Sequence, residues 1–324
     1  MPKYLDPFLI LLLMTVAMAS FFPCHGSGVL FFNNLAVIAI ALMFFLQGAR
    51  LSRQAVIEGI FHWRLHLLIF ACTFVIFPIL GLGLHYLFPK MLLPDLWMGI
   101  LFLCCLPSTV QSSIAFTSIA KGNVPAAICS ATASNILGIF ITPFLVGSIF
   151  SNHHQAIFSR DNLNIVYQLL LPFIMGQILQ PWIREWALKN SRLLSCSDRG
   201  SILIVVYTAF SQAVNMGLWY KLSLYQLMKL ILIDVVLLDS ILIISFLLSK
   251  LFKFCWQDQI SIVFCGSKKS LASGVPIANV LLPPSMVGMI ILPLMIFHQI
   301  QLFVIAIIAQ YCNKISDKKK VYKT

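Results

Sequence analysis

A chain of 324 residues that is 60% hydrophobic and 10% charged cannot bury its apolar surface inside a water-soluble globule, so the composition predicts an integral membrane protein. The net charge of +12 would indicate a nucleic-acid partner in a soluble protein, but here the basic residues lie between apolar spans, where they report topology and contact with anionic lipid. The sequence contains no phosphate-binding loop, nucleophile elbow or metal-ligand cluster. We therefore expect no enzyme, no nucleic-acid partner and no cofactor other than a bound ion.

Apolar stretches of a length suited to a bilayer recur along the whole chain. They predict about ten spans, near residues 7–22, 29–49, 67–88, 96–121, 124–150, 165–182, 201–220, 228–249, 262–277 and 286–311. With this even number, the lysines and arginines gather on one side of the membrane, which the positive-inside rule makes the cytoplasmic side, and both termini lie there. We expect a first five-helix repeat (1–150), a loop (151–164), a second repeat (165–312) and a basic cytoplasmic tail (313–324).

The fourth span is interrupted by polar residues. Its apolar run stops at Pro107, the segment from Ser108 to Ser113 is densely polar, and apolar residues resume at Ile114. Non-helical backbone at membrane depth is tolerated where it lines a cavity enclosed by protein. We therefore predict a broken helix at this point.

The ninth span, from Ile262 to Ile277, is interrupted as well, because Lys268 and Lys269 lie near its middle. An ammonium group at the bilayer centre costs about 2.5–3.5 kcal/mol, so these lysines need water, partners or a broken backbone around them. Since each repeat has an odd number of spans, the two repeats must be inverted relative to one another, and the two broken spans take equivalent places in them. Such a pair is typical of the binding site of a secondary transporter.

Two carboxylates in the eighth span are candidate partners for these lysines. Asp234 and Asp239 are separated by about 140° on an ideal helix, so they do not share one face. Intramembrane carboxylates usually pair with a cation or relay protons. We expect Asp239, the deeper of the two, to be the counter-ion of a ninth-span lysine, whereas Asp234 can equally be solvated near the outer interface.

Several short motifs together resemble one transporter family. They are Phe45-Leu-Gln-Gly-Ala-Arg-Leu-Ser52, Cys104-Cys-Leu-Pro-Ser-Thr-Val-Gln-Ser-Ser113, Ala120-Lys-Gly-Asn-Val124, Ile141-Thr-Pro143, Asp198-Arg-Gly-Ser-Ile-Leu203, Val206-Tyr-Thr-Ala-Phe-Ser211 and Cys265-Gly-Ser-Lys-Lys-Ser270. Over nearly its whole length, the chain resembles the bile acid:sodium symporter family, and more specifically its bacterial branch of sodium-dependent transporters. The resemblance implies a bacterial inner-membrane protein with ten helices in two inverted repeats.

In that family, helices 1, 2, 6 and 7 form a panel domain, helices 3–5 and 8–10 form a core domain, and the broken fourth and ninth helices cross in the core. Sodium sits near the crossing, and an organic anion binds between the domains. Carried over to this sequence, the resemblance places a sodium ion at Ser112, Ser113 and Thr132. With the polar residues of both breaks, the candidate substrate- or ion-binding residues are Thr73, Gln111, Ser112, Ser113, Ser130, Thr132, Ser267, Lys268, Lys269 and Ser270.

The ninth span departs from the family pattern. Where the sodium-coupled members have a glutamate and, four residues later, a glutamine, this sequence has Phe264 and Lys268. Replacing a carboxylate and adding an ammonium opposes binding of a second sodium ion. Three roles stay open for Lys268 or Lys269: a built-in cation that replaces sodium, a ligand for a carboxylate, sulfate or phosphate of the substrate, or a group that changes protonation.

The sequence therefore predicts a secondary transporter that moves a small organic anion, with or without sodium, by alternating access between panel and core domains. One alternative is a membrane regulator or ion-handling protein that keeps the transporter fold. Another is proton-coupled transport through Lys268 or Lys269 and Asp239. No feature of the sequence indicates an oligomeric state.

Overall fold

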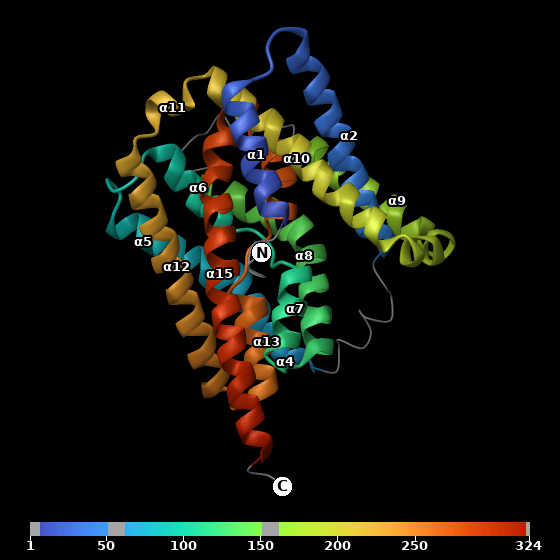
Figure 1. Ribbon diagram of the computed structural model, residues 1–324, viewed down its shortest axis with the longest axis vertical. Helices are drawn as coiled ribbons and strands as arrows, with labels where there is room; N and C mark the ends of the chain where they lie inside the picture. The colour runs from blue at the N-terminus through green and yellow to red at the C-terminus, as the bar shows by residue number, and fades with distance from the viewer. Residues whose placement is uncertain (1–6, 51–61, 151–161, 322–324) are drawn as a thin grey trace. The chain divides into compact units, whose positions relative to one another are not determined.

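The computed structural model describes residues 7–50, 62–150 and 162–321, and every regular element in these ranges is a helix (Figure 1). The elements are α1 (Pro7–Phe21), α2 (Ser27–Arg50), α4 (Trp63–Ala71), the π-helical segment η2 (Cys72–Ile76), α5 (Phe77–Leu87), α6 (Pro94–Cys104), α7 (Gln111–Ile119), α8 (Val124–Phe150), α9 (Asn162–Lys189), α10 (Ser191–Asn215), α11 (Leu218–Lys221), α12 (Leu224–Leu251), α13 (Trp256–Gly266), α14 (Leu271–Leu281) and α15 (Pro284–Val321). The predicted all-α class is confirmed for the described residues.

Among the described residues, five segments are long and apolar enough to cross a membrane. They are Ser27–Ala49, Trp63–Leu87, Val124–Phe150, Leu224–Leu251 and Met286–Lys314. Shorter apolar helices cover Ile10–Phe21, Pro94–Cys104 and Leu170–Ile183. The ten-span inverted repeat stays a prediction, and most of its connecting loop (151–164) lies outside the described residues.

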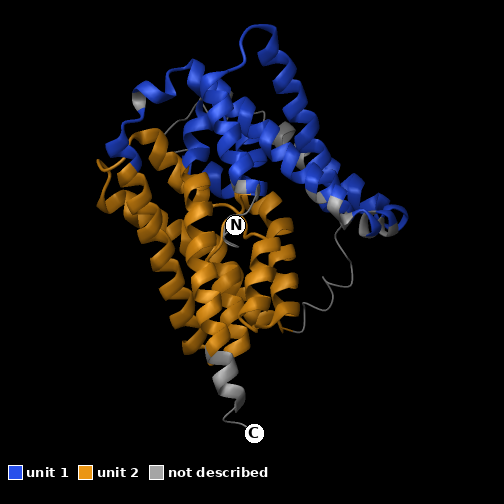
Figure 2. Ribbon diagram, in the orientation of Figure 1, with its two compact units in different colours: residues 1–52, 143–227, 272–292 blue, residues 53–142, 228–271, 293–324 orange. Residues whose placement is uncertain are grey.

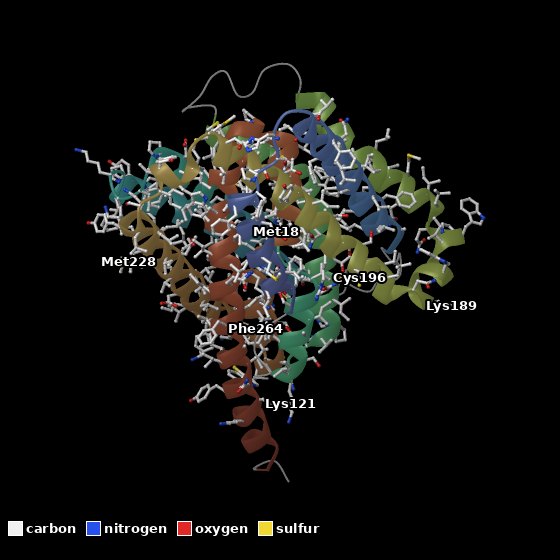
Figure 3. The ribbon with its side chains drawn as sticks, turned by 45° about the horizontal axis from the view of Figure 1, so that its top comes forward. Met18, Lys121, Lys189, Cys196, Met228 and Phe264 are labelled. Carbon is white, nitrogen blue, oxygen red and sulfur yellow. The ribbon has the colours of Figure 1, made fainter. Side chains whose placement is uncertain are left out.

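Large apolar side chains are exposed along these helices, as expected of surfaces that face lipid. Figure 3 labels two of them, Met18 and Met228, which are 57% and 63% exposed. Phe264, labelled in the same figure, is only 1% exposed. At the carboxyl end, α15 continues to Val321, so the predicted tail (313–324) is helical over its described part.

The chain divides into two compact units, each built from segments far apart in the sequence (Figure 2). Unit 1 comprises residues 1–52, 143–227 and 272–292, and unit 2 comprises residues 53–142, 228–271 and 293–324. Unit 1 therefore contains α1, α2, α9, α10 and nearly all of α14, whereas unit 2 contains α4 to α7, α13 and most of α8, α12 and α15. The assignment of panel and core domains stays a prediction.

Within unit 1, glycines let α2 and α9 approach closely, because a methyl-sized group does not fit between the helices. A Cβ atom at Gly48 would overlap the carbonyl oxygen of Phe173, and one at Gly176 would overlap that of Phe45. The side-chain amide of Gln177 also donates to the Gly48 carbonyl at 2.5 Å. Small residues and a polar contact thus fix this helix pair, as is usual where lipid supplies no hydrophobic drive between helices.

Within unit 2, the beginnings of α8 and α13 are tied together. The side-chain amide of Asn123 donates to Asp258 at 2.8 Å, and the main-chain carbonyl of Asn123 accepts from the Ser261 hydroxyl at 2.9 Å. Asp258 lies in the first turn of α13, where a negative charge is favourable because the first N–H groups of a helix point toward it. This contact fixes the start of both helices, and α13 also packs against α4 and α7.

Candidate functional site

The two predicted breaks are present, and they meet inside unit 2. Helix α6 ends at Cys104 and α7 begins at Gln111, while α13 ends at Gly266 and α14 begins at Leu271. The backbone N–H of Ser270 donates to the Pro107 carbonyl at 2.9 Å, and the Ser108 hydroxyl donates to the Cys265 carbonyl at 2.5 Å. The polar stretches that interrupt the two helices are therefore in direct contact.

The first break leaves several backbone carbonyls without the N–H donors that a continuous helix would supply. Pro107 has no N–H to donate, and the N–H of Ser108 turns to the Ser134 hydroxyl instead of continuing the helix. Every carbonyl from 104 to 108 nevertheless has a donor. The pairs are Cys104 and Leu106 with Lys269 Nζ, Cys105 with Thr142 Oγ1, Pro107 with Ser270 N, and Ser108 with Asn135 Nδ2.

Lys269 has the most complete set of partners in this region. Its side chain is fully buried, and Nζ lies 2.7 Å from each of three carbonyl oxygens, those of Thr73, Cys104 and Leu106. The nitrogen also lies 4.2 Å from the centre of the Phe77 ring, a cation–π contact. An ammonium group has three N–H donors, whereas a neutral amine has two, so this geometry fits the charged form.

The Thr73 carbonyl is free to accept from Lys269 because of the π-helical segment before Pro78. In this segment the N–H of Phe77 bonds to the Cys72 carbonyl, five residues back. The next donor in that pattern would be residue 78, and proline has no N–H. Thr73, predicted as a binding position for its side chain, therefore contributes its backbone, while its hydroxyl donates to the Ile69 carbonyl at 2.9 Å.

Gln301 on α15 holds the backbone of the second break, and the sequence reading missed it. Its side-chain oxygen accepts from the Lys269 N–H and its side-chain nitrogen donates to the Lys269 carbonyl, both at 2.9 Å. His298, one turn earlier, lies 2.8 Å from the same side-chain nitrogen. A glutamine within an apolar span was the available signal, but the sequence does not say which backbone it contacts.

Lys268 differs from its neighbour in the surroundings of its ammonium group. The side chain is fully buried, and within the described part of the chain no group accepts a hydrogen bond from Nζ. The nitrogen lies 4.2 Å from the centre of the Phe116 ring on α7. A buried charge of this kind is stabilised only partly by an aromatic face, so the position is suited to an anionic ligand.

Hydroxyl groups gather at the start of α7. Thr109 Oγ1 lies 2.8 Å from Ser112 Oγ and 3.0 Å from Ser113 Oγ, and Ser113 donates to the Phe264 carbonyl at 3.4 Å. Lys268 Nζ lies over the ring of Phe116, which follows Ser112 and Ser113 by one turn on the same helix. We call these groups, Thr109, Ser112, Ser113 and the Lys268 ammonium, the α7 corner.

The remaining predicted site residues take other places. Ser130 is buried and lies 2.6 Å from Nδ1 of His66 on α4, and Ser267 donates to the Val263 carbonyl at 2.6 Å. Thr132 is half-buried, and Gln111 is exposed at the first position of α7. The structure thus groups Ser112 and Ser113, and the sodium site predicted at Ser112, Ser113 and Thr132 stays a prediction.

The expected lysine counter-ion needs a correction. Asp239 is exposed, whereas both ammonium groups are fully buried and the three donors of Lys269 are used by carbonyls, so Asp239 does not pair with either lysine. The buried carboxylate of α12 is Asp234, which is 0% exposed, and neither of its oxygens has a partner among the described residues. The sequence left a solvated Asp234 near the outer interface as an open alternative, because it does not show which face of α12 points inward.

Comparison with known proteins identifies the family. The profile of the SBF-like CPA transporter family matches residues 6–314. The chain belongs to this family. The resemblance to the bile acid:sodium symporter family noted from the sequence is thereby confirmed, and the protein is an integral membrane transporter.

Known relatives align with this chain over most of their length. The "Uncharacterized protein PA2026" of Pseudomonas aeruginosa is 52% identical over 98% of this chain and 96% of its own length. The "Putative symporter YfeH" of Escherichia coli is 50% identical over 95% of this chain and 93% of its own length. The "Sodium/bile acid cotransporter 7-A" of Xenopus laevis is 28% identical over 83% of this chain and 79% of its own length.

Proposed function

We propose that this protein is a secondary transporter that moves a small organic anion across the bacterial inner membrane by alternating access between panel and core domains. The names of its relatives, a symporter and a sodium/bile acid cotransporter, support solute transport with an anionic substrate. The basic residues between its apolar segments support an orientation with both termini in the cytoplasm and contact with anionic lipids.

The observation that carries the substrate class is the buried Lys268 ammonium, which has no hydrogen-bond partner within the described ranges. A charge buried in a membrane protein without a counter-ion is costly, and it marks a substrate or ion pathway more often than a structural contact. A carboxylate, sulfate or phosphate group would supply the missing negative charge and acceptors. We infer that such a group binds at the α7 corner.

The α7 corner also offers neutral donors to an anion. The hydroxyls of Thr109, Ser112 and Ser113 can rotate to donate, and the first N–H groups of α7 have no partner inside the helix. Helix beginnings favour anions because these N–H groups point outward. One charged group and several neutral donors are suited to a single acidic head group, with the rest of the substrate in contact with apolar surface.

The coupling ion has two candidates. Sodium at Ser112, Ser113 and Thr132 is supported by the names of the cotransporter relatives. A proton is supported by Asp234, a fully buried carboxyl group whose oxygens have no hydrogen-bond partner among the described residues, because intramembrane carboxyl groups commonly belong to proton relays. Asp234 therefore replaces Asp239 in the proton-coupled alternative.

Binding to the purified protein tests the proposed substrate class. We would measure thermal unfolding of the wild type and of Lys268→Met across titrations of a bile acid, a short dicarboxylate, an aryl sulfate and a phosphate monoester. A saturable stabilisation of the wild type by one of these anions, lost in Lys268→Met, is expected from ligand linkage. An equal stabilisation of both proteins would place the binding group elsewhere.

A further inference from the structure

Three carbonyl oxygens converge on one point inside unit 2. They belong to Thr73 in η2 and to Cys104 and Leu106 at the end of α6, and each lies 2.7 Å from Lys269 Nζ. Rings of backbone carbonyls are the means by which membrane proteins replace the hydration shell of a monovalent cation. We call the three oxygens the carbonyl cage.

The carbonyl cage consists of backbone oxygens that the local helix geometry leaves without N–H partners. The Thr73 oxygen is left free because Phe77 bonds to Cys72 and Pro78 has no N–H. The Cys104 and Leu106 oxygens are left free because α6 ends there and Pro107 prevents its continuation. The oxygens would therefore need a positively charged or N–H donor partner even if residue 269 had none to offer.

We propose that the Lys269 ammonium is a tethered cation, which permanently fills a site whose oxygen ligands are suited to a free monovalent cation. The full burial of the side chain and the use of all three N–H donors support this assignment to Lys269. Lys268 Nζ has no such ligands in the part of the chain that the structure describes. Of the roles left open by the sequence, the built-in cation belongs to Lys269.

Gln301 strengthens the argument because it fixes the residue from which the ammonium extends. It bonds both the N–H and the carbonyl of Lys269, so the backbone at the start of the side chain cannot rotate without breaking two hydrogen bonds. A tether held in this way keeps the ammonium in the carbonyl cage. For transport, a consequence that rests on the proposed function, no free cation enters or leaves this site during the cycle.

The test removes the tethered ammonium and supplies a free one. We would purify the full-length wild type and the variants Lys269→Ala, Lys269→Met and Lys268→Ala, and record thermal unfolding across titrations of methylammonium, potassium and sodium chloride, with choline chloride holding the ionic strength constant. Lys269→Ala is expected to unfold at a lower temperature than the wild type. Methylammonium should raise that temperature saturably, because it replaces the lost end of the side chain.

The other proteins are the controls. The wild type and Lys268→Ala should not respond to methylammonium beyond the effect of choline, because their cage is filled. Lys269→Met should respond less than Lys269→Ala, because its side chain occupies the path to the cage. Should Lys269→Ala be unstable in choline, the yield of monodisperse protein extracted in methylammonium replaces the unfolding temperature as the readout.

The proposal is overturned if neither Lys269 variant responds to any of the three cations, in folded yield or in unfolding temperature. It is also overturned if all four proteins respond alike. Because the readout is stability, these results do not depend on anion transport. Failure of the tethered cation is therefore distinguishable from failure of the proposed function, which the anion titrations of the wild type and the Lys268 variant test.

Discussion

Lys268 and Lys269 are adjacent in the sequence, yet their ammonium groups have opposite surroundings. Lys269 Nζ donates to three carbonyl oxygens, each at 2.7 Å, whereas Lys268 Nζ has no hydrogen-bond acceptor among the described residues. Both side chains are fully buried, and each ammonium lies 4.2 Å from the centre of an aromatic ring. The difference between them is therefore hydrogen bonding, and the structural role proposed for Lys269 and the ligand-binding role proposed for Lys268 both rest on it.

The first prediction compares the same substitution at the two lysines. Lys269→Met leaves three buried carbonyls without a donor, each at a cost of roughly 1–3 kcal/mol, so the unfolding temperature should fall strongly. Lys268→Met removes a buried charge that has no hydrogen-bond partner among the described residues, and it should leave stability unchanged or higher. Thermal unfolding in one detergent measures both. A larger loss in Lys268→Met than in Lys269→Met would contradict the assignment.

The second prediction concerns Gln301. Gln301→Leu removes both hydrogen bonds to the Lys269 backbone, leaving a buried N–H and a buried carbonyl unpaired, at about 1–3 kcal/mol each. Gln299→Leu, at a half-buried position on the same helix, is the matched control and should lower the free energy of unfolding much less. Chemical or thermal unfolding measures the difference. Equal stability of the two variants would show that the backbone of the second break does not need this clamp.

The third prediction concerns the close approach of α2 and α9. Gly176→Ala places a methyl group against the Phe45 carbonyl, and overpacking of this kind costs about 1–3 kcal/mol. Gly200→Ala on α10 is the control, because a Cβ atom there meets nothing within 4 Å, and it should stabilise the helix by about 0.5–1 kcal/mol. Unfolding temperatures that change in the same direction would show that this helix pair can move apart without cost.

The fourth prediction separates the two carboxylates of α12. Asp234→Leu removes a buried polar group that has no hydrogen-bond partner in the described ranges, and it should raise the free energy of unfolding by roughly 1–3 kcal/mol. Asp239→Leu changes an exposed position and should have little effect on stability. If Asp234 carries the coupling proton, anion uptake driven by a pH gradient should be lost in Asp234→Leu and kept in Asp239→Leu. The reverse pattern would restore the pairing expected from the sequence.

The sequence was sufficient to locate both helix breaks, because their causes are local. Proline at 107 and the polar run after it end one helix, and the lysine pair interrupts the other. The partners within the site could not be read in the same way. Lys269 and Thr73 interact through backbone oxygens, which carry no residue-specific signal, and Gln301 reaches the second break from another helix.

The carboxylates show a different limit of sequence reasoning. Their separation by about 140° correctly predicts that Asp234 and Asp239 point in different directions. Depth along the span was used to choose between them, but burial depends on which face of α12 meets the other helices. The structure buries Asp234 and exposes Asp239, so the carboxylate expected to be the lysine counter-ion is the exposed one.

Uptake into proteoliposomes tests most directly whether the protein is an anion transporter that uses Lys268. Wild type and Lys268→Met would be reconstituted at matched density into liposomes loaded with the anion that stabilises the wild type. Exchange of this anion with labelled anion outside would be measured in sodium and in potassium buffers. The account predicts saturable exchange by the wild type and little exchange by Lys268→Met. Exchange by Lys268→Met at the wild-type rate would contradict it.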